Sequence, residues 1–194
     1  DASWTIANQS INSDSIIYSF GVGTDISFDL DLIKKYNVDI HAFDPTPKSI
    51  EWVKKQNITQ KFIMHEHGLA AFTGSIEFTL PDNPEYISGS IDNMLGSAGN
   101  TISISVKDLK TIMNDLSHSR IDILKMDIEG SEYDVIDDLI SNKIIVQQLL
   151  IEFHHRFPKI GIKKTKEAIK KLNNYGFKIF HISNNGEEYS FIKD

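Results

Sequence analysis

The chain has 194 residues, of which 40% are hydrophobic and 24% are charged, and its formal net charge is −7. This balance predicts a single globular domain over residues 1–194. The negative charge argues against a nucleic-acid partner, and no apolar run reaches the ~18 residues that a membrane helix needs. The absence of cysteine excludes disulfides, a thiolate nucleophile and cysteine-ligated zinc, and it agrees with a cytoplasmic protein.

Short β-rich segments alternate with helical patterns in the first half of the chain. Four segments predict strands: residues 15–20, which read as a buried strand, 38–43, 61–67, and 69–80, where a Thr-Gly turn separates two strands. Ile26, Leu30 and Ile33 recur at helical spacing and predict a helix that ends near Asn37. A second helix follows the second strand, with Pro47 tolerated in its first turn.

The second half continues the alternation and ends in a hairpin. Strands are predicted over residues 101–106, 121–126 and 147–153, and helices over residues 107–116, 131–140 and 163–176. Two further strands flank the tight-turn sequence NNGE, so they should pair antiparallel. The pattern predicts an α/β, Rossmann-like fold, with a mostly parallel sheet, a C-terminal antiparallel hairpin and helices on both faces.

Two segments are candidates for binding the substrate. Residues 81–100 are rich in Pro, Gly, Ser and Asn, and a loop of that length is often a substrate lid. Closure over the site together with Trp4, and simple packing, are the two interpretations. Seven of the 20 basic residues lie between Lys159 and Lys178. An anionic-substrate site and the solvated face of a helix are the two interpretations, and the second is favoured because Ile162, Ile169 and Leu172 supply an apolar face.

Two glycines, Gly21 and Gly23, follow the first predicted strand. In an open α/β sheet, a glycine turn at a strand end lets the backbone approach a ligand. The nicotinamide fingerprint requires a third glycine where this chain has Ile26, and Asp25 would repel a pyrophosphate at the helix N-terminus. The ligand is therefore predicted to be a nucleoside without phosphates, of which S-adenosylmethionine (SAM) is the common example.

Asp44 ends the second predicted strand, 21 residues after Gly23. An acidic side chain there can accept hydrogen bonds from both ribose hydroxyls. The alternative is an N-cap for the following helix, since Asp caps helices well. Ribose binding does not separate SAM from NAD, but the C-terminal hairpin favours a methyltransferase sheet.

Five segments together resemble the FkbM family of SAM-dependent methyltransferases: YSFGVGTDISFD, HAFDPTPKSIEW, GLAAFTGSIEFTLP, LKMDIEGSEYDVI and LLIEFHHRF. The resemblance extends from Trp4 to Ile192, and KMDIEGSEY is its most specific segment. It implies a class I methyltransferase fold and methyl transfer, mostly to oxygen on sugars or natural products. One departure lies in the first strand, where the family commonly has an acidic residue before the glycine turn and this chain has Tyr18-Ser19-Phe20.

The predicted cofactor site draws on the ends of four strands. Its residues are Gly21, Val22, Gly23, Asp25, Asp44, Pro45, Thr46, His67, Gly68, Leu69, Asp127 and Glu129. Residues 67–69 fall where such folds shape an adenine pocket. Asp127 and Glu129 directly follow a strand, at the edge where methyl donor and acceptor would meet. The alternative is a helix start, in which Glu129 and Glu132 favour the positive N-terminal dipole.

His154 and His155 follow the strand that ends near Glu152. Because histidine titrates near neutral pH, one of them is predicted to be the general base, with Asp127 as a further catalytic candidate. We predict no metal, although two alternatives exist. A divalent ion held by Asp127, Glu152 and His154 is the first, and the pair formed by His65 and His67 is the second.

The predicted function is SAM-dependent O-methylation of a hydroxyl on a sugar or other small natural product. The alternatives are a nicotinamide-dependent oxidoreductase and a SAM-binding protein without catalysis. We expect a small-molecule acceptor, with neither nucleic acid nor membrane as partner. The sequence carries no signal for a particular oligomeric state.

Overall fold

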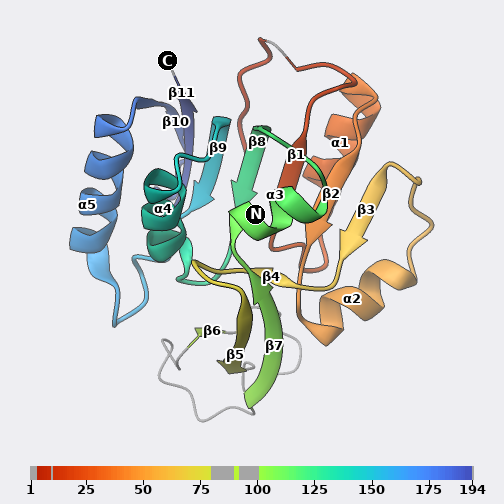
Figure 1. The fold of residues 1–194 in the computed structure, drawn as a ribbon, viewed down its shortest axis with the longest axis horizontal. Helices are drawn as coiled ribbons and strands as arrows, with labels where there is room; N and C mark the ends of the chain where they lie inside the picture. The colour runs from red at the N-terminus through yellow and green to blue at the C-terminus, as the bar shows by residue number, and fades with distance from the viewer. Residues whose placement is uncertain (1–3, 10, 80–89, 92–100, 194) are drawn as a thin grey trace.

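A seven-stranded sheet forms the centre of the computed structural model (Figure 1). The structure describes residues 4–9, 11–79, 90–91 and 101–193. The strands of the sheet are β1 (Ile17–Phe20), β2 (Ile40–Phe43), β3 (Phe62–His65), β8 (Ile121–Met126), β9 (Val146–Glu152), β10 (Phe177–Ile182) and β11 (Glu188–Lys193). They lie in the order β10-β11-β9-β8-β1-β2-β3, and β11 is antiparallel to both of its neighbours while the other pairs are parallel. The predicted sheet and hairpin are confirmed.

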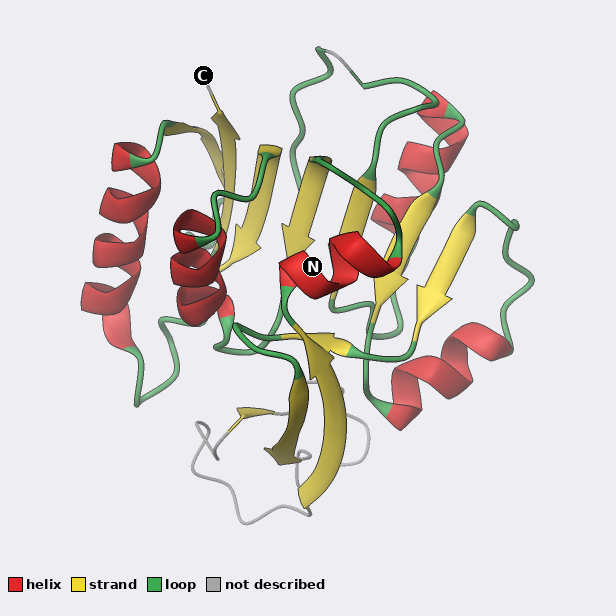
Figure 2. Cartoon of the chain, in the orientation of Figure 1, coloured by secondary structure: helices red, strands yellow, loops and turns green. Residues whose placement is uncertain are grey.

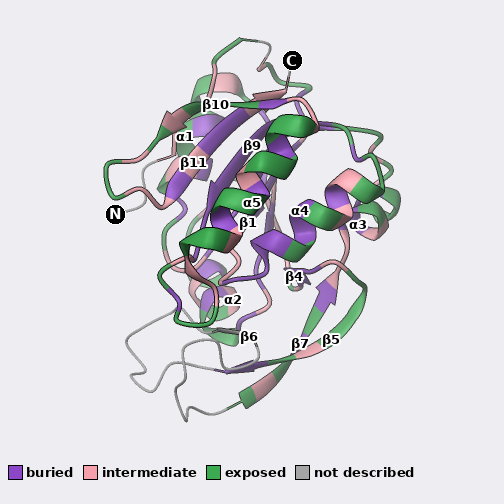
Figure 3. Cartoon of the chain, turned by 90° about the vertical axis from the view of Figure 1, so that its left-hand side faces the viewer, coloured by how far each residue is buried: buried purple, intermediate pink, exposed green. Residues whose placement is uncertain are grey.

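Helices cover both faces of this sheet (Figure 2). They are α1 (Ser27–Tyr36), α2 (Pro47–Lys54), α3 (Leu109–Asp115), α4 (Glu132–Ser141) and α5 (Gly161–Asn174). Alternation along β1 sends Tyr18 into a core shared with α3, α4 and α5, and Ile17 into a core shared with α1 and α2. Figure 3 shows the central strands almost wholly buried, while α5 exposes its outer side.

Two helix faces differ from their predicted registers. Leu30 is 38% exposed, because Asp29 and Leu32 occupy the inward positions of α1. Ile162 is 50% exposed at the start of α5, whose buried residues are Thr165, Ala168 and Leu172. The lysines of α5 lie outside this buried stripe, as the solvated-face interpretation expects.

A second, smaller sheet lies beyond the carboxyl ends of the parallel strands, at the bottom of Figure 1. It contains β4 (Gly68–Leu69), β5 (Gly74–Thr79), β6 (Ser90–Ile91) and β7 (Thr101–Lys107), in the order β4-β7-β5-β6. The sequence predicted strands here but no separate sheet. The two strands expected within residues 69–80 do not pair with each other, because β7 lies between them.

The predicted substrate lid, residues 81–100, lies outside the described residues except for β6. No helix in the described part of the chain is long and apolar enough to cross a membrane.

Candidate active site

A pocket of about 290 Å³ opens where the strand order of the main sheet reverses. At that point β1 lies between β2 and β8, and ligands of open α/β sheets bind at such a reversal, beyond the carboxyl ends of the strands. The described lining residues are Trp4, Phe20, Gly21, Val22, Gly23, Thr24, Asp25, Ser27, Phe28, Asp29, Phe43, Asp44, Pro45, Thr46, Gly68, Leu69, Ile76, Phe78, Ile104, Val106, Lys125, Asp127, Ile128 and Glu129. All of the predicted cofactor residues except His67 are among them.

Gly21 fits tightly between the ends of the neighbouring strands. Its φ is +81°, and a Cβ atom built on it would lie 2.0 Å from the backbone oxygen of Asp127. The Gly21 amide donates to the carbonyl of Phe43, and the Asp127 amide donates to the carbonyl of Phe20. The glycine is therefore required by close approach of the chain's own backbone, in addition to any approach by a ligand.

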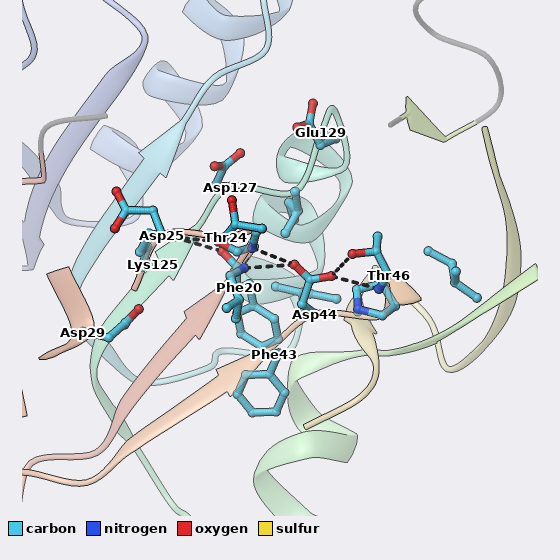
Figure 4. Close-up of a pocket in the computed structure, with 18 of the residues that line it drawn as sticks. Phe20, Thr24, Asp25, Asp29, Phe43, Asp44, Thr46, Lys125, Asp127 and Glu129 are labelled. Atoms are coloured by element: carbon cyan, nitrogen blue, oxygen red, sulfur yellow. Dashed lines mark hydrogen bonds between the residues drawn. The ribbon is translucent and has the colours of Figure 1, made fainter. Parts of the chain in front are cut away.

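Asp44 holds the glycine turn against the loop that follows β2 (Figure 4). Its Oδ2 accepts from the amides of Val22 (3.1 Å) and Gly23 (3.0 Å). Its Oδ1 accepts from the amide (2.8 Å) and the hydroxyl (2.6 Å) of Thr46. The N-cap of α2 is Thr46 rather than Asp44. This carboxylate, which is 5% exposed, thus positions the pocket wall, whether or not it also binds a ribose.

Lys125 and Asp29 are pocket residues that the sequence did not reveal. The Lys125 ammonium donates to the carbonyls of Phe20 (3.3 Å) and Gly21 (3.1 Å) and lies 5.0 Å from the centre of the Trp4 ring. Asp29 is 2% exposed, its burial raises its carboxyl pKa, and its Oδ1 has no hydrogen-bond partner among the described residues. The only sequence signals for these two pocket residues were that Lys125 lies within an apolar strand and that Asp29 lies on the inward face of a helix.

Apolar side chains form much of the remaining pocket wall. Phe20 and Phe43 stack at 4.3 Å between ring centres, and the second sheet contributes the side chains of Leu69, Ile76, Phe78, Ile104 and Val106. Gly68 approaches Pro45, since a Cβ atom there would lie 3.1 Å from the proline ring. His67 does not line the pocket; its ring lies beside that of Phe43, 5.3 Å between centres.

His154 lies just behind the pocket, within a group of carboxylates. It is fully buried, and its Nδ1 is 2.8 Å from Glu132 Oε1. Its Nε2 is 3.2 Å from Glu129 Oε2, 3.6 Å from Asp127 Oδ1 and 3.7 Å from Glu152 Oε1. Glu132 also accepts from the amide of Gly130, at 3.0 Å. The loop after β8, the start of α4 and the end of β9 thereby meet at one imidazole.

The carboxylates and the imidazole shift one another's pKa. Burial lowers the pKa of His154, but the charges of Glu132 and Glu129, together with the hydrogen bond to Glu132, outweigh it and raise the pKa to about 11. Burial, together with the Glu152 charge, raises the pKa of Asp127 to about 7. Burial also raises the pKa of Glu152. Without a substrate or ion, the group thus holds protons that isolated side chains would release.

Glu129 adopts a backbone conformation that is unusual for a residue with a side chain. Its φ is +53°, and the next residue, Gly130, has a φ of +105°. Such strain in non-glycine residues concentrates at functional sites, because the surrounding structure must stabilise it. Here it places a side chain that lines the pocket beside His154.

A family model described as "Methyltransferase FkbM domain" matches residues 18–179. The chain belongs to the FkbM methyltransferase family. Among curated proteins, this FkbM chain is 26% identical over 192 residues to "Probable methyltransferase-like protein 24" of Homo sapiens and 24% identical over 191 residues to that of Rattus norvegicus. Each match covers 93% of the FkbM chain and 46% of the relative, so the chain spans just under half the length of these relatives.

Two solved structures of fibrillarin share the fold of the FkbM chain. The Methanococcus jannaschii fibrillarin pre-rRNA processing protein matches with a TM-score of 0.55 and 14% identity, covering 94% of this chain and 68% of that one. Aeropyrum pernix fibrillarin, solved with natively bound S-adenosyl-L-methionine, matches with a TM-score of 0.51 and 10% identity, covering 94% of this chain and 67% of the fibrillarin chain. At these identities the likeness shows the fold alone, and it confirms the predicted Rossmann-like methyltransferase sheet.

The structure brings together some of the candidate catalytic residues of this FkbM domain, and one of the two alternative metal clusters. Asp127 lines the pocket, whereas His154 and His155 do not, so the assignment of a histidine as general base stays a prediction. Asp127, Glu152 and His154 do come together. His65 and His67 do not share a strand, because β3 ends at His65, and within the described residues no third ligand joins them.

Proposed function

We propose that this chain binds SAM in the pocket at the ends of β1, β2 and β8 and transfers its methyl group to an acceptor. The charge of the pocket supports this most strongly. Its described lining includes five carboxylates, those of Asp25, Asp29, Asp44, Asp127 and Glu129, against a single cationic side chain, Lys125. SAM carries a sulfonium and an ammonium and is net positive, whereas the pyrophosphate of NAD would meet carboxylate repulsion.

The arrangement of the lining supports a particular orientation of SAM. The apolar wall around Phe43 and Leu69 suits the adenine, and the turn held by Asp44 suits the ribose. The methionine ammonium would satisfy the unpartnered Oδ1 of Asp29, which takes the part of the acidic residue absent from β1. The sulfonium methyl would then lie toward Asp127 and Glu129, at the end of β8.

The reaction proposed for this site is O-methylation of a sugar or another small hydroxylated acceptor. The acceptor oxygen forms a bond to the methyl carbon, the sulfur–methyl bond breaks, S-adenosylhomocysteine (SAH) leaves, and the hydroxyl proton goes to a carboxylate. Alignment of donor and acceptor can lower the barrier by about 7–11 kcal/mol, and a positioned base adds about 10²–10⁴-fold. We place the proton on Asp127 rather than on His154, because Asp127 lines the pocket and His154 does not.

A nucleic-acid acceptor, which the name of the M. jannaschii pre-rRNA processing protein would suggest, is disfavoured by the net charge of −7.

Titration calorimetry with SAM, SAH and NAD⁺ tests the proposal. We expect one equivalent of SAM and of SAH to bind, and no heat of binding from NAD⁺. Asp29→Asn should weaken SAM and SAH at least tenfold, because the ammonium loses its charged partner. The matched control is Asp31→Asn on the same helix, at a position that is exposed and outside the pocket lining, and it should leave both affinities unchanged.

Binding of NAD⁺ in place of SAM would overturn the proposal. Binding of SAM without SAH production from any hydroxylated acceptor would identify a protein that kept the cofactor pocket but not the reaction.

A further inference from the structure

A second potential ligand site adjoins the SAM pocket at the end of β9. Asp127, Glu152 and His154 each offer one ligand atom, and these atoms all lie within 4.8 Å of one another. The separations from His154 Nε2 are 3.6 Å to Asp127 Oδ1 and 3.7 Å to Glu152 Oε1. We propose that these three side chains bind one divalent transition-metal ion.

The buried imidazole of His154 supports a metal site more strongly than the carboxylates do. His154 has no exposed surface, and its Nε2 forms no hydrogen bond within the described residues, although three carboxylates surround it. A buried polar nitrogen without a partner is costly, so it points to a missing ligand. An ion within reach of Nε2 would satisfy it.

Glu132 orients the imidazole in the way that metal-binding histidines require. Its Oε1 lies 2.8 Å from His154 Nδ1, and it is itself fully buried and held by the Gly130 amide. When Nδ1–H donates to a carboxylate, the ring is fixed, and an ion that displaces the Nε2 proton to solvent finds the Nε2 lone pair directed outward. Histidines bound to metals commonly make this contact on their other nitrogen.

The distances between the ligand atoms suit a small dication. Metal bonds to imidazole nitrogen and carboxylate oxygen are about 2.0–2.2 Å, which places tetrahedral ligand atoms about 3.4 Å apart. The separations of 3.6 and 3.7 Å need only a small contraction to reach that value. Arg156 donates to the same oxygen of Glu152 at 3.1 Å and keeps this carboxylate in place.

Charge and access also favour a cation here. Four carboxylates, Asp127, Glu129, Glu132 and Glu152, lie within 3.7 Å of one imidazole. A dication would offset this excess of negative charge. The Asp127 side chain is 29% exposed and lines the pocket, so an ion can enter from there.

The role of the ion rests on the proposed function, although the binding site does not. An open coordination position facing the pocket would bind the acceptor hydroxyl and favour loss of its proton, which Asp127 can accept on its second oxygen. A site with one nitrogen and two carboxylate ligands suits Mn²⁺ or Zn²⁺ better than Mg²⁺, which prefers oxygen alone.

Electron paramagnetic resonance of added Mn²⁺ tests the site in protein without a polyhistidine tag and without SAM. We expect one bound Mn²⁺ per chain, displaced by Zn²⁺ and not by an equal concentration of Mg²⁺. Glu152→Gln and Asp127→Asn should each weaken Mn²⁺ at least tenfold, because each removes a charged ligand. Glu187→Gln is the matched control, since Glu187 also pairs with Arg156 (3.0 Å) but is not among the ligand atoms.

Absence of bound Mn²⁺, or equal binding by wild type and Glu152→Gln, would overturn the metal site. Because the measurement contains no SAM, neither result bears on cofactor binding. Conversely, loss of SAM binding in calorimetry would refute the proposed function and leave the Mn²⁺ result standing.

Discussion

Replacement of Gly21 by alanine should disrupt the junction of β1 and β8 far more than its size suggests. The φ of +81° alone strains any L-residue by about 1–2 kcal/mol. The new methyl carbon would also lie 2.0 Å from the Asp127 carbonyl oxygen, a backbone atom that cannot rotate away. Overpacking of that kind adds about 1–3 kcal/mol, so we expect a total loss of about 2–5 kcal/mol in the free energy of unfolding.

Gly186→Ala separates the two contributions. Gly186 has a φ of +78°, and a Cβ atom built there meets nothing within 4 Å, so only the backbone strain applies. Urea unfolding followed by circular dichroism should give a loss of about 1–2 kcal/mol for Gly186→Ala, with similar m-values for both variants. Only Gly21→Ala should also weaken SAM binding, by at least tenfold, because it displaces Asp127. Equal destabilisation of the two variants would refute the role assigned to the close approach.

Two further predictions concern histidine titration and Asp44. Burial lowers the pKa of His41 and of His65 to about 4, below the unfolded value of about 6.5, so stability present above pH 6.5 should be lost as the pH falls toward 4. Because both rings are only half-buried, we expect the free energy of unfolding to fall by about 1–2 kcal/mol in total between pH 7 and pH 5, as measured by urea unfolding. A His41→Gln/His65→Gln variant that shows the same fall would contradict this cause. Asp44→Asn should weaken SAM binding at least tenfold in calorimetry and destabilise the fold by about 2–4 kcal/mol, because an amide nitrogen would face backbone amides that now donate to the carboxylate. An unchanged affinity and unfolding midpoint in Asp44→Asn would show that the turn does not depend on this carboxylate.

The main sheet could be predicted because its signals are local. Buried strands read as short apolar runs, and the sequence NNGE between two such runs specifies an antiparallel hairpin. Gly21 and Gly23 mark the end of β1, and the order of alternating elements then brings Asp44 and Asp127 to the same edge of the sheet. These residues were found because parallel strands end together.

The second sheet could not be predicted because its pairings are not local. Residues 69–80 show two strands with a turn between them, and that pattern favours a hairpin. Instead, β7 arrives from beyond residue 100 and separates the two strands. A strand pattern records which side of a strand is apolar and does not record which strand lies beside it.

The buried polar contacts of the site were missed for a related reason. Lys125 donates to backbone carbonyls about a hundred residues earlier in the chain, and a backbone acceptor leaves no mark on composition. Glu132 was interpreted as a helix-start residue, which is correct, but its contact with His154 spans 22 residues and depends on how α4 meets β9. Only the packed structure shows that His154 lies among carboxylates and outside the pocket lining.

A crystal structure of the chain with SAH tests the central claim most directly. We predict that the adenosine lies between the glycine turn at Gly21–Gly23 and the apolar wall around Leu69, with the methionine ammonium within hydrogen-bond distance of Asp29 and the sulfur toward Asp127. SAH bound elsewhere, or an empty pocket at saturating SAH in a chain that is folded in solution, would contradict the assignment of this pocket as the SAM site.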